Sequence, residues 1–161
     1  MRYRTIHTLV CFLLLMAANI QADNLTQPVS LVPCPVSIVP GTGNFHFSEE
    51  TTFAVENEEQ AVEVRRFTAL LTRAAGFTPR IKVGNKKGDV CLTTDVGLKE
   101  EAYKLEITAK RINIHAADVQ GFFYALQSIR QLLPAAIEGG QVVTGIDWTV
   151  PAGTITDPPR F

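Results

Sequence analysis

Between residues 103 and 116 the sequence alternates apolar and polar side chains on both sides of a short turn. The apolar positions flanking the turn at Ala109-Lys110 are Tyr103, Leu105, Ile107, Ile112, Ile114 and Ala116. A period of two residues is typical of a strand with one buried face. Because the alternation matches on both sides of the turn, the sequence predicts an antiparallel hairpin here.

A helix is predicted directly after this hairpin. Asp118 can cap its first turn with a side-chain oxygen, and Pro134 ends it because proline cannot continue a helix. The apolar stripe at helical spacing consists of Phe122, Leu126, Ile129 and Leu133. Gly121 lies in the first turn, where glycine costs roughly 1 kcal/mol of helix propensity relative to alanine. We therefore expect its missing side chain to permit close approach to the sheet.

An earlier helix is predicted to begin at Asn57, which can act as its cap, with Gln60 three residues later in capping-box position. Its apolar stripe consists of Val64, Phe67, Leu71 and Ala74. Gly76 is suited to end this helix in the left-handed conformation.

The remaining strands are predicted to be short. Phe45 and Phe47 alternate with polar residues, and residues 51–55 form a second candidate. Arg80 to Val83 and Val90 to Thr93 flank a glycine-containing turn, which predicts a second hairpin. The prolines between residues 27 and 40 favour an extended lead-in at a sheet edge.

These elements indicate an α+β fold, with a single, mostly antiparallel sheet and two helices packed on one face. We expect the folded domain to span residues 23–134. Residues 135–161 become glycine-rich and lose periodicity, so they are predicted to form a linker with one or two short strands near Val142 and Thr149.

The first 22 residues have the pattern of a secretory signal peptide. Arg2 and Arg4 give a basic start, residues 9–18 are apolar, and Ala22 is a small residue before the polar Asp23. The apolar run is shorter than the roughly 20 residues that a membrane-spanning helix needs, so no membrane span is predicted. The sequence thus predicts export, to the periplasm or the extracellular medium.

The charge balance does not favour a nucleic-acid partner. The chain has 15 Lys and Arg against 16 Asp and Glu, whereas nucleic-acid binding needs a basic face or stripe.

Two cysteines, Cys34 and Cys91, remain after the leader, and an oxidising compartment permits one disulfide between them. Two buried free thiols are the alternative.

Two motifs carry a family resemblance. Gly121-Phe122-Phe123-Tyr124 opens the second predicted helix, and Asp157-Pro158-Pro159-Arg160-Phe161 ends the chain. Together with the hairpin before them, they resemble the N-terminal domain of family 20 glycoside hydrolases, the exo-acting β-N-acetylhexosaminidases. The resemblance implies that a catalytic (β/α)8 barrel follows the domain and that the substrate's own acetamido group assists cleavage. It implies amino-sugar glycans as substrates of the parent enzyme.

The catalytic residues of that family are not found in this sequence. The family uses an adjacent Asp-Glu pair on a barrel strand, and no Asp-Glu dipeptide occurs here. Arg160 does not match the family's substrate-binding arginine, which stands in an Arg-Gly pair. A barrel needs about 250 residues. We therefore predict no catalytic, cofactor-binding or metal-binding residue, and we expect the chain alone to be inactive although its family is enzymatic.

Other residues with chemical potential have structural explanations. His46 and His115 are isolated, which argues against a zinc site. The acidic pairs at residues 49–50, 58–59 and 100–101 lie at turns or at a helix start, where the helix dipole favours carboxylates. For residues 122–124 the helical spacing favours a packing role over an aromatic platform for sugars.

The leading hypothesis is an accessory domain that packs against a sugar-cleaving barrel. One alternative is a free-standing exported module that binds carbohydrate or a partner protein. Another is an accessory domain of a different glycosidase, such as an α-glucuronidase. The sequence that follows residue 161 distinguishes these possibilities.

Overall fold

The computed structural model describes residues 31–32 and 34–158. The predicted leader and residues 159–161 of the terminal motif lie outside the described residues. No helix within the described part of the chain combines the length and apolar character needed to cross a membrane.

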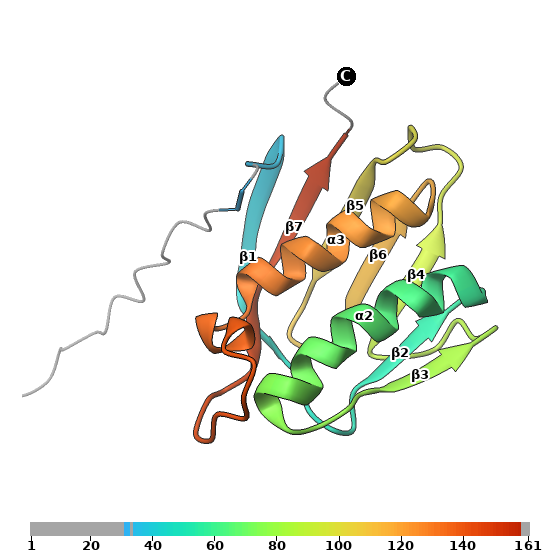
Figure 1. The fold of residues 1–161 in the computed structure, drawn as a ribbon. Coiled ribbons are helices and arrows are strands. Elements are labelled where there is room, and N and C mark those ends of the chain that lie inside the picture. Colours follow the sequence, from blue (N-terminus) through green and yellow to red (C-terminus); the bar gives the residue numbers. More distant parts are fainter. Residues whose placement is uncertain (1–30, 33, 159–161) are drawn as a thin grey trace, which may run out of the picture.

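A seven-stranded sheet forms one layer, and two helices form the other (Figure 1). The strand order is β1-β7-β5-β6-β4-β2-β3. The α+β class and the two helices on one face are confirmed. The elements are β1 (Ser37–His46), β2 (Thr52–Val55), α2 (Glu58–Ala75), β3 (Arg80–Val83), β4 (Val90–Thr94), β5 (Tyr103–Ile107), β6 (Ile112–Ala116), α3 (Val119–Leu132), the 3-10 helix η1 (Ala135–Glu138) and β7 (Thr149–Asp157).

The sheet is mixed rather than mostly antiparallel. β1, β7, β5 and β6 pair antiparallel, whereas β6, β4, β2 and β3 pair parallel. Within the parallel half, β2 and β3 are parallel because α2 carries the chain from the end of β2 back to the start of β3. A crossover of this kind returns the next strand in the same direction.

The hairpin of β5 and β6 is confirmed, with Tyr103 opposite Ala116 and Ile107 opposite Ile112. Its turn is closed by Thr108, whose amide donates to the Arg111 carbonyl at 2.9 Å. The Thr108 hydroxyl oxygen accepts from the Arg111 amide at 3.0 Å. The local turn therefore fixes the register that the alternation predicts.

The second predicted hairpin is wrong, because β2 lies between β3 and β4. The segment between the two strands crosses β2 instead of reversing. A Cβ on Gly88 would lie 2.8 Å from the Thr52 carbonyl oxygen, and the Asp89 amide donates to that same oxygen at 2.9 Å. The glycine is thus needed for a close backbone crossing, and β3 and β4 each pair parallel with β2.

The expected boundary at residue 134 is also wrong for the segment that contains β7. This strand lies between β1 and β5, so residues 149–157 belong to the sheet and not to a linker. The short strand expected near Thr149 is therefore present but longer than predicted, whereas the described residues around Val142 form no strand.

Pro151 and Gly153 hide the length of β7 because both residues are unusual in central strands. Pro151 pairs with Asn44 of β1, next to an irregular step in the β1 register. The pairing of β7 with β5 begins only at Gly153, two residues after the proline.

Both predicted helix starts are confirmed. Asn57 Oδ1 accepts from the Gln60 amide at 3.0 Å, and Asp118 Oδ1 accepts from the Gly121 amide at 2.8 Å. Gly76 ends α2 with φ +79°, in the left-handed conformation. The Gln60 side chain accepts from the Glu56 amide at 2.8 Å, one residue before the partner that a capping box uses.

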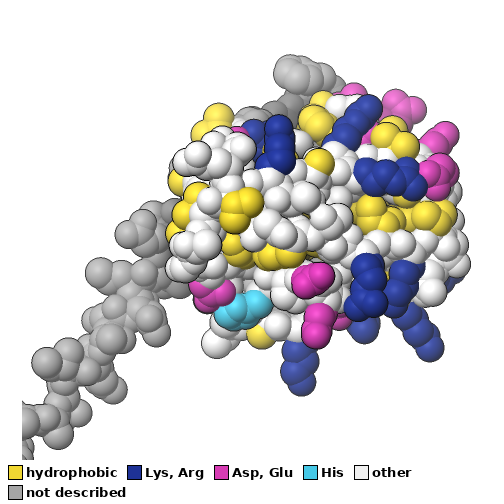
Figure 2. Space-filling model, turned by 60° about the horizontal axis from the view of Figure 1, so that its bottom comes forward, with side chains coloured by type: hydrophobic (Ala, Val, Ile, Leu, Met, Phe, Trp, Pro, Cys, Tyr) yellow, Lys and Arg dark blue, Asp and Glu magenta, His cyan; other side chains and the backbone are white. Residues whose placement is uncertain are grey.

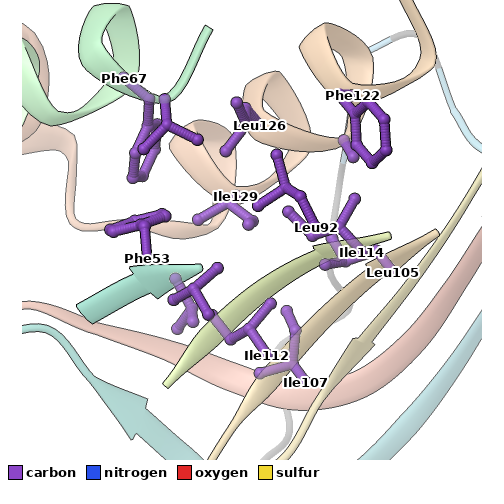
Figure 3. Close-up of a cluster of buried hydrophobic side chains, with 14 of the residues drawn as sticks. Phe53, Phe67, Leu92, Leu105, Ile107, Ile112, Ile114, Phe122, Leu126 and Ile129 are labelled. Carbon is purple, nitrogen blue, oxygen red and sulfur yellow. The ribbon is translucent and has the colours of Figure 1, made fainter. Parts of the chain in front are cut away.

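The core lies between the sheet and the helices (Figure 3). Phe53 and Ile112 rise from the sheet toward the helical layer, and Phe67 and Leu126 descend from α2 and α3. Phe53 and Phe67 are part of a cluster of aromatic rings whose neighbouring centroids lie 5.0–6.4 Å apart.

Of the two outcomes left open for Cys91, disulfide or free thiol, the structure has the free thiol. Cys91 is buried, and its Sγ donates to the Gly88 carbonyl at 3.3 Å.

Candidate docking surface

The residues with chemical potential do not converge. His46 Nδ1 lies 3.1 Å from Asp147 Oδ1 in an exposed pair at one end of the molecule. His115 lies on β6, in register with Lys104 of β5 and Thr93 of β4. Within residues 31–32 and 34–158 there is no group of three or more His, Cys, Asp or Glu side chains that could hold a metal ion.

Two of the three acidic pairs contain a residue with a structural contact. Glu58 Oε1 forms an ion pair with Arg65 Nη2 at 2.6 Å along α2. Glu101 adopts φ +65°, and its amide donates to Asp118 Oδ2 at 2.9 Å. This bond ties the loop before β5 to the start of α3. The carboxylate of Asp118 therefore caps a helix and orders a loop at the same time.

One carboxylate that the sequence analysis did not single out joins three elements. Glu56 Oε2 accepts from the Thr94 amide at 2.9 Å and from Gln60 Nε2 at 3.2 Å. Burial opposes its ionisation, but the hydrogen bonds from Thr94 and Gln60 outweigh burial and hold the pKa of Glu56 below its usual value. This group links the ends of β2 and β4 to the start of α2, which identifies it as a structural carboxylate.

The aromatic cluster of α3 divides between the core and the surface. Phe122 is buried beneath the helix (Figure 3), whereas Tyr124 is 38% exposed. The ring centroids of Phe123 and Tyr124 lie 5.6 Å apart in a tilted arrangement. Packing, the role that helical spacing favours, is confirmed for Phe122, while Tyr124 contributes apolar surface.

Apolar side chains are exposed on the helical layer. Val62 of α2 and Val119 of α3 are each 39% exposed. Val142 is exposed beside the C-terminal end of α2, where a Cβ on Gly76 would lie 3.3 Å from its side chain. We call these residues together with Tyr124 the helical docking surface. The opposite face of the sheet carries polar residues between the buried ones of β5 and β6, including Lys104, Glu106, Asn113 and His115.

A groove runs along the flank of α2 that faces β3. Its volume is about 700 Å³, and its apolar wall is formed by Ala69, Pro79 and Ile81. Arg65 and Arg73 lie along the same groove. The hydroxyl groups of Thr72 and Thr78 are hydrogen-bonded at 2.9 Å and fix the end of α2 to the segment before β3.

Residues 28–158 match the family described as Glycosyl hydrolase family 20, domain 2. The chain is 28% identical to a β-hexosaminidase of Porphyromonas gingivalis over 94% of its own length and 20% of that enzyme. It is 29% identical to a lacto-N-biosidase of Bifidobacterium bifidum, over 86% of this chain and 12% of that one.

Solved structures agree with these sequence relatives. The Streptomyces plicatus N-acetyl-β-hexosaminidase, in complex with Thio-NAglucal, superposes with a TM-score of 0.75 and 30% sequence identity. The superposition covers 84% of this chain and 27% of that enzyme. In these relatives the domain is attached to a much larger catalytic protein. With a family match that covers most of its length and a fold that agrees, the chain belongs to family 20 of the glycosyl hydrolases, as domain 2 of that family.

Proposed function

We propose that this chain is the non-catalytic accessory domain of an exported exo-β-N-acetylhexosaminidase. In this proposal the domain packs against the (β/α)8 barrel of the parent enzyme, which hydrolyses terminal N-acetylglucosamine or N-acetylgalactosamine residues by the substrate-assisted mechanism. The family match over residues 28–158 is the observation that carries the proposal. The chain corresponds to only 20% of the length of its β-hexosaminidase relative.

The two faces of the domain support a packing role. Contacts between domains of one chain typically bury about 600–1,500 Å² and combine apolar with polar groups. The helical docking surface offers exposed Val62, Val119, Tyr124 and Val142. The other face of the sheet, with its charged and amide side chains, is suited to contact with water. The barrel is therefore expected to cover the helices.

The range of relatives also favours a structural role over substrate selection. One relative is named a β-hexosaminidase and another a lacto-N-biosidase, yet both contain a region that aligns with this domain. A domain that accompanies different activities fits a role in stabilising the barrel.

Export forms part of the proposal and rests on the leader at residues 1–22. Expression of the complete chain with a C-terminal tag tests this part. N-terminal sequencing of the secreted or periplasmic product is expected to begin at Asp23. A product that retains Met1 and stays in the cytoplasm would contradict export.

The parent enzyme is tested by reading the coding sequence that follows residue 161. We expect a continuous frame that encodes an Arg-Gly pair within a few residues and an Asp-Glu pair within a barrel. The encoded protein is then expressed with and without residues 23–158, and removal of the domain is expected to lower the thermal midpoint or solubility of the barrel. A stop codon directly after Phe161, with no barrel-coding frame downstream, would instead favour a free-standing binding module.

A further inference from the structure

Strand β3 ends the sheet with an unpaired edge. It pairs with β2 alone, and the Arg80 amide donates to the Thr51 carbonyl at 3.0 Å. Main-chain groups alternate sides along a strand, and Arg80 and Lys82 lie opposite Thr52 and Ala54 of β2. The N–H and C=O groups of Ile81 and Val83 therefore point to the free edge.

Side chains around this edge also alternate in character. Ile81 and Val83 lie opposite the buried Phe53 and Val55 of β2, so they point toward the helical layer and the groove beside α2. Arg80 and Lys82, at the alternate positions, point to the opposite face of the sheet. A strand added at this edge would thus meet apolar surface on one face and cationic groups on the other.

Cationic side chains predominate around the edge. Arg73 lies along the groove, and Arg80 and Lys82 lie on β3, which contains no Asp or Glu. Arg65 also lines the groove, but its charge is balanced by the ion pair with Glu58. Figure 2 shows Lys and Arg side chains above and below an apolar strip at the right of that view, with Asp and Glu side chains at its upper right. Two β3 edges from two copies would repel each other, because each carries Arg80 and Lys82. An acidic strand would instead be attracted.

The other edge of the sheet differs in each of these respects. The register of β1 is irregular between Pro40 and Asn44, and this strand carries no Lys, Arg, Asp or Glu. Bulges and prolines hinder the addition of a further strand. β3 pairs in regular register over all four of its residues. The two edges are therefore not equivalent as docking sites.

We infer that the free edge of β3 and the adjoining groove bind an extended acidic peptide segment, in which acidic residues alternate with apolar ones. The main chain of the segment would pair with Ile81 and Val83. Its apolar side chains would enter the groove beside Ala69 and Ile81, and its carboxylates would face Arg80 and Lys82. Addition of a strand to a sheet edge is a general mode of peptide recognition. This inference goes beyond the proposed function and does not depend on a barrel.

The probe for this site is a fluorescein-labelled peptide of three Glu-Val repeats, titrated with the purified chain, residues 23–161, while anisotropy is recorded. We expect saturable binding that weakens at least tenfold between low salt and about 0.5 M NaCl, because salt screens exposed charges. A matched peptide of three Lys-Val repeats is expected not to bind. Amide chemical-shift changes on titration should centre on Ile81 and Val83.

Two variants separate main-chain pairing from charge. Val83→Pro removes an edge N–H and is expected to weaken binding at least tenfold, whereas Val83→Thr retains the N–H and should leave binding nearly unchanged. Arg80→Glu combined with Lys82→Glu should abolish binding, while Lys110→Glu with Arg111→Glu, in the β5–β6 turn, should not. If Val83→Pro does not fold, a probe with N-methylated valines tests the same pairing.

Absence of binding at 1 mM peptide would overturn the inference. Equal binding of the Lys-Val peptide would also overturn it, as would shift changes centred on the β1 edge or on the open face of the sheet.

Discussion

Gly121 of α3 lies directly against the carbonyl group of Ala102, which immediately precedes β5. A Cβ at position 121 would stand 2.6 Å from the Ala102 oxygen and 2.9 Å from the Cβ of Ala116. These distances are shorter than van der Waals contact, so glycine permits the start of α3 to rest on the β5–β6 hairpin. The close approach expected from the sequence is confirmed.

The first prediction concerns this contact. Gly121→Ala should destabilise the domain by about 1 kcal/mol. Overpacking a well-packed site typically costs about 2 kcal/mol, and alanine recovers roughly 1 kcal/mol of this in helix propensity. Urea unfolding followed by circular dichroism measures the difference. Gln120→Ala, at the exposed neighbouring position, is the control and should change stability by less than about 0.5 kcal/mol.

The second prediction concerns pH. Because the folded-state pKa of Glu56 is lowered, its stabilisation is present above the unfolded pKa and is lost as the pH falls through the folded pKa. Glu56→Gln should therefore lower the free energy of unfolding by about 1 kcal/mol at pH 7. The difference from the unmodified domain should shrink below pH 4. Glu49→Gln, in an exposed turn, is the control, and a gap for Glu56→Gln that stays constant with pH would contradict this assignment.

The third prediction concerns a buried hydroxyl pair. Tyr103 Oη lies 2.7 Å from Ser128 Oγ, which links β5 to α3 inside the core. Tyr103→Phe should cost about 1 kcal/mol of unfolding free energy, the usual net value of such a hydrogen bond. Tyr124→Phe is the matched control because Tyr124 is exposed, and it should have little effect. Equal destabilisation by both variants would argue against the hydrogen bond as the cause.

The fourth prediction concerns the helical docking surface. Val62→Lys should leave the stability of the isolated domain within about 0.5 kcal/mol, because Val62 is an exposed helix position. It should weaken association with the separately expressed barrel, which analytical gel filtration can follow. Asn113→Lys, on the opposite face of the sheet, is the control. If Asn113→Lys abolished association and Val62→Lys did not, the barrel would cover the open face of the sheet and not the helices, which would contradict the prediction.

Local signals in the sequence predict the local parts of the fold. The β5–β6 hairpin follows from alternation around a turn, and both helices follow from a cap and an apolar stripe. The partner of β3 could not be predicted, because β2 enters between β3 and β4 only through the tertiary crossover at Gly88. A short strand near Thr149 was predicted, but Pro151 obscured the length of β7 and its place inside the sheet. The missing N–H of Pro151 is tolerated because β7 pairs with β1 at this residue and with β5 only from Gly153 onward.

The candidate surfaces were less predictable than the fold. Exposure of Val62 and Tyr124 depends on how α2 and α3 pack side by side, which a helical pattern alone does not define. The role of Glu56 depends on the amide of Thr94, 38 residues away in the sequence. The groove beside α2 exists because β3 ends the sheet, and this position follows from the strand order.

Whether bond cleavage lies outside this domain is tested by the activity of the purified chain, residues 23–161, toward nitrophenyl N-acetyl-β-glucosaminide. If bond cleavage belongs to the barrel and this domain only supports it, nitrophenol release should not exceed the rate without protein. Saturable turnover by the chain alone, persisting after independent expression and purification, would contradict the account.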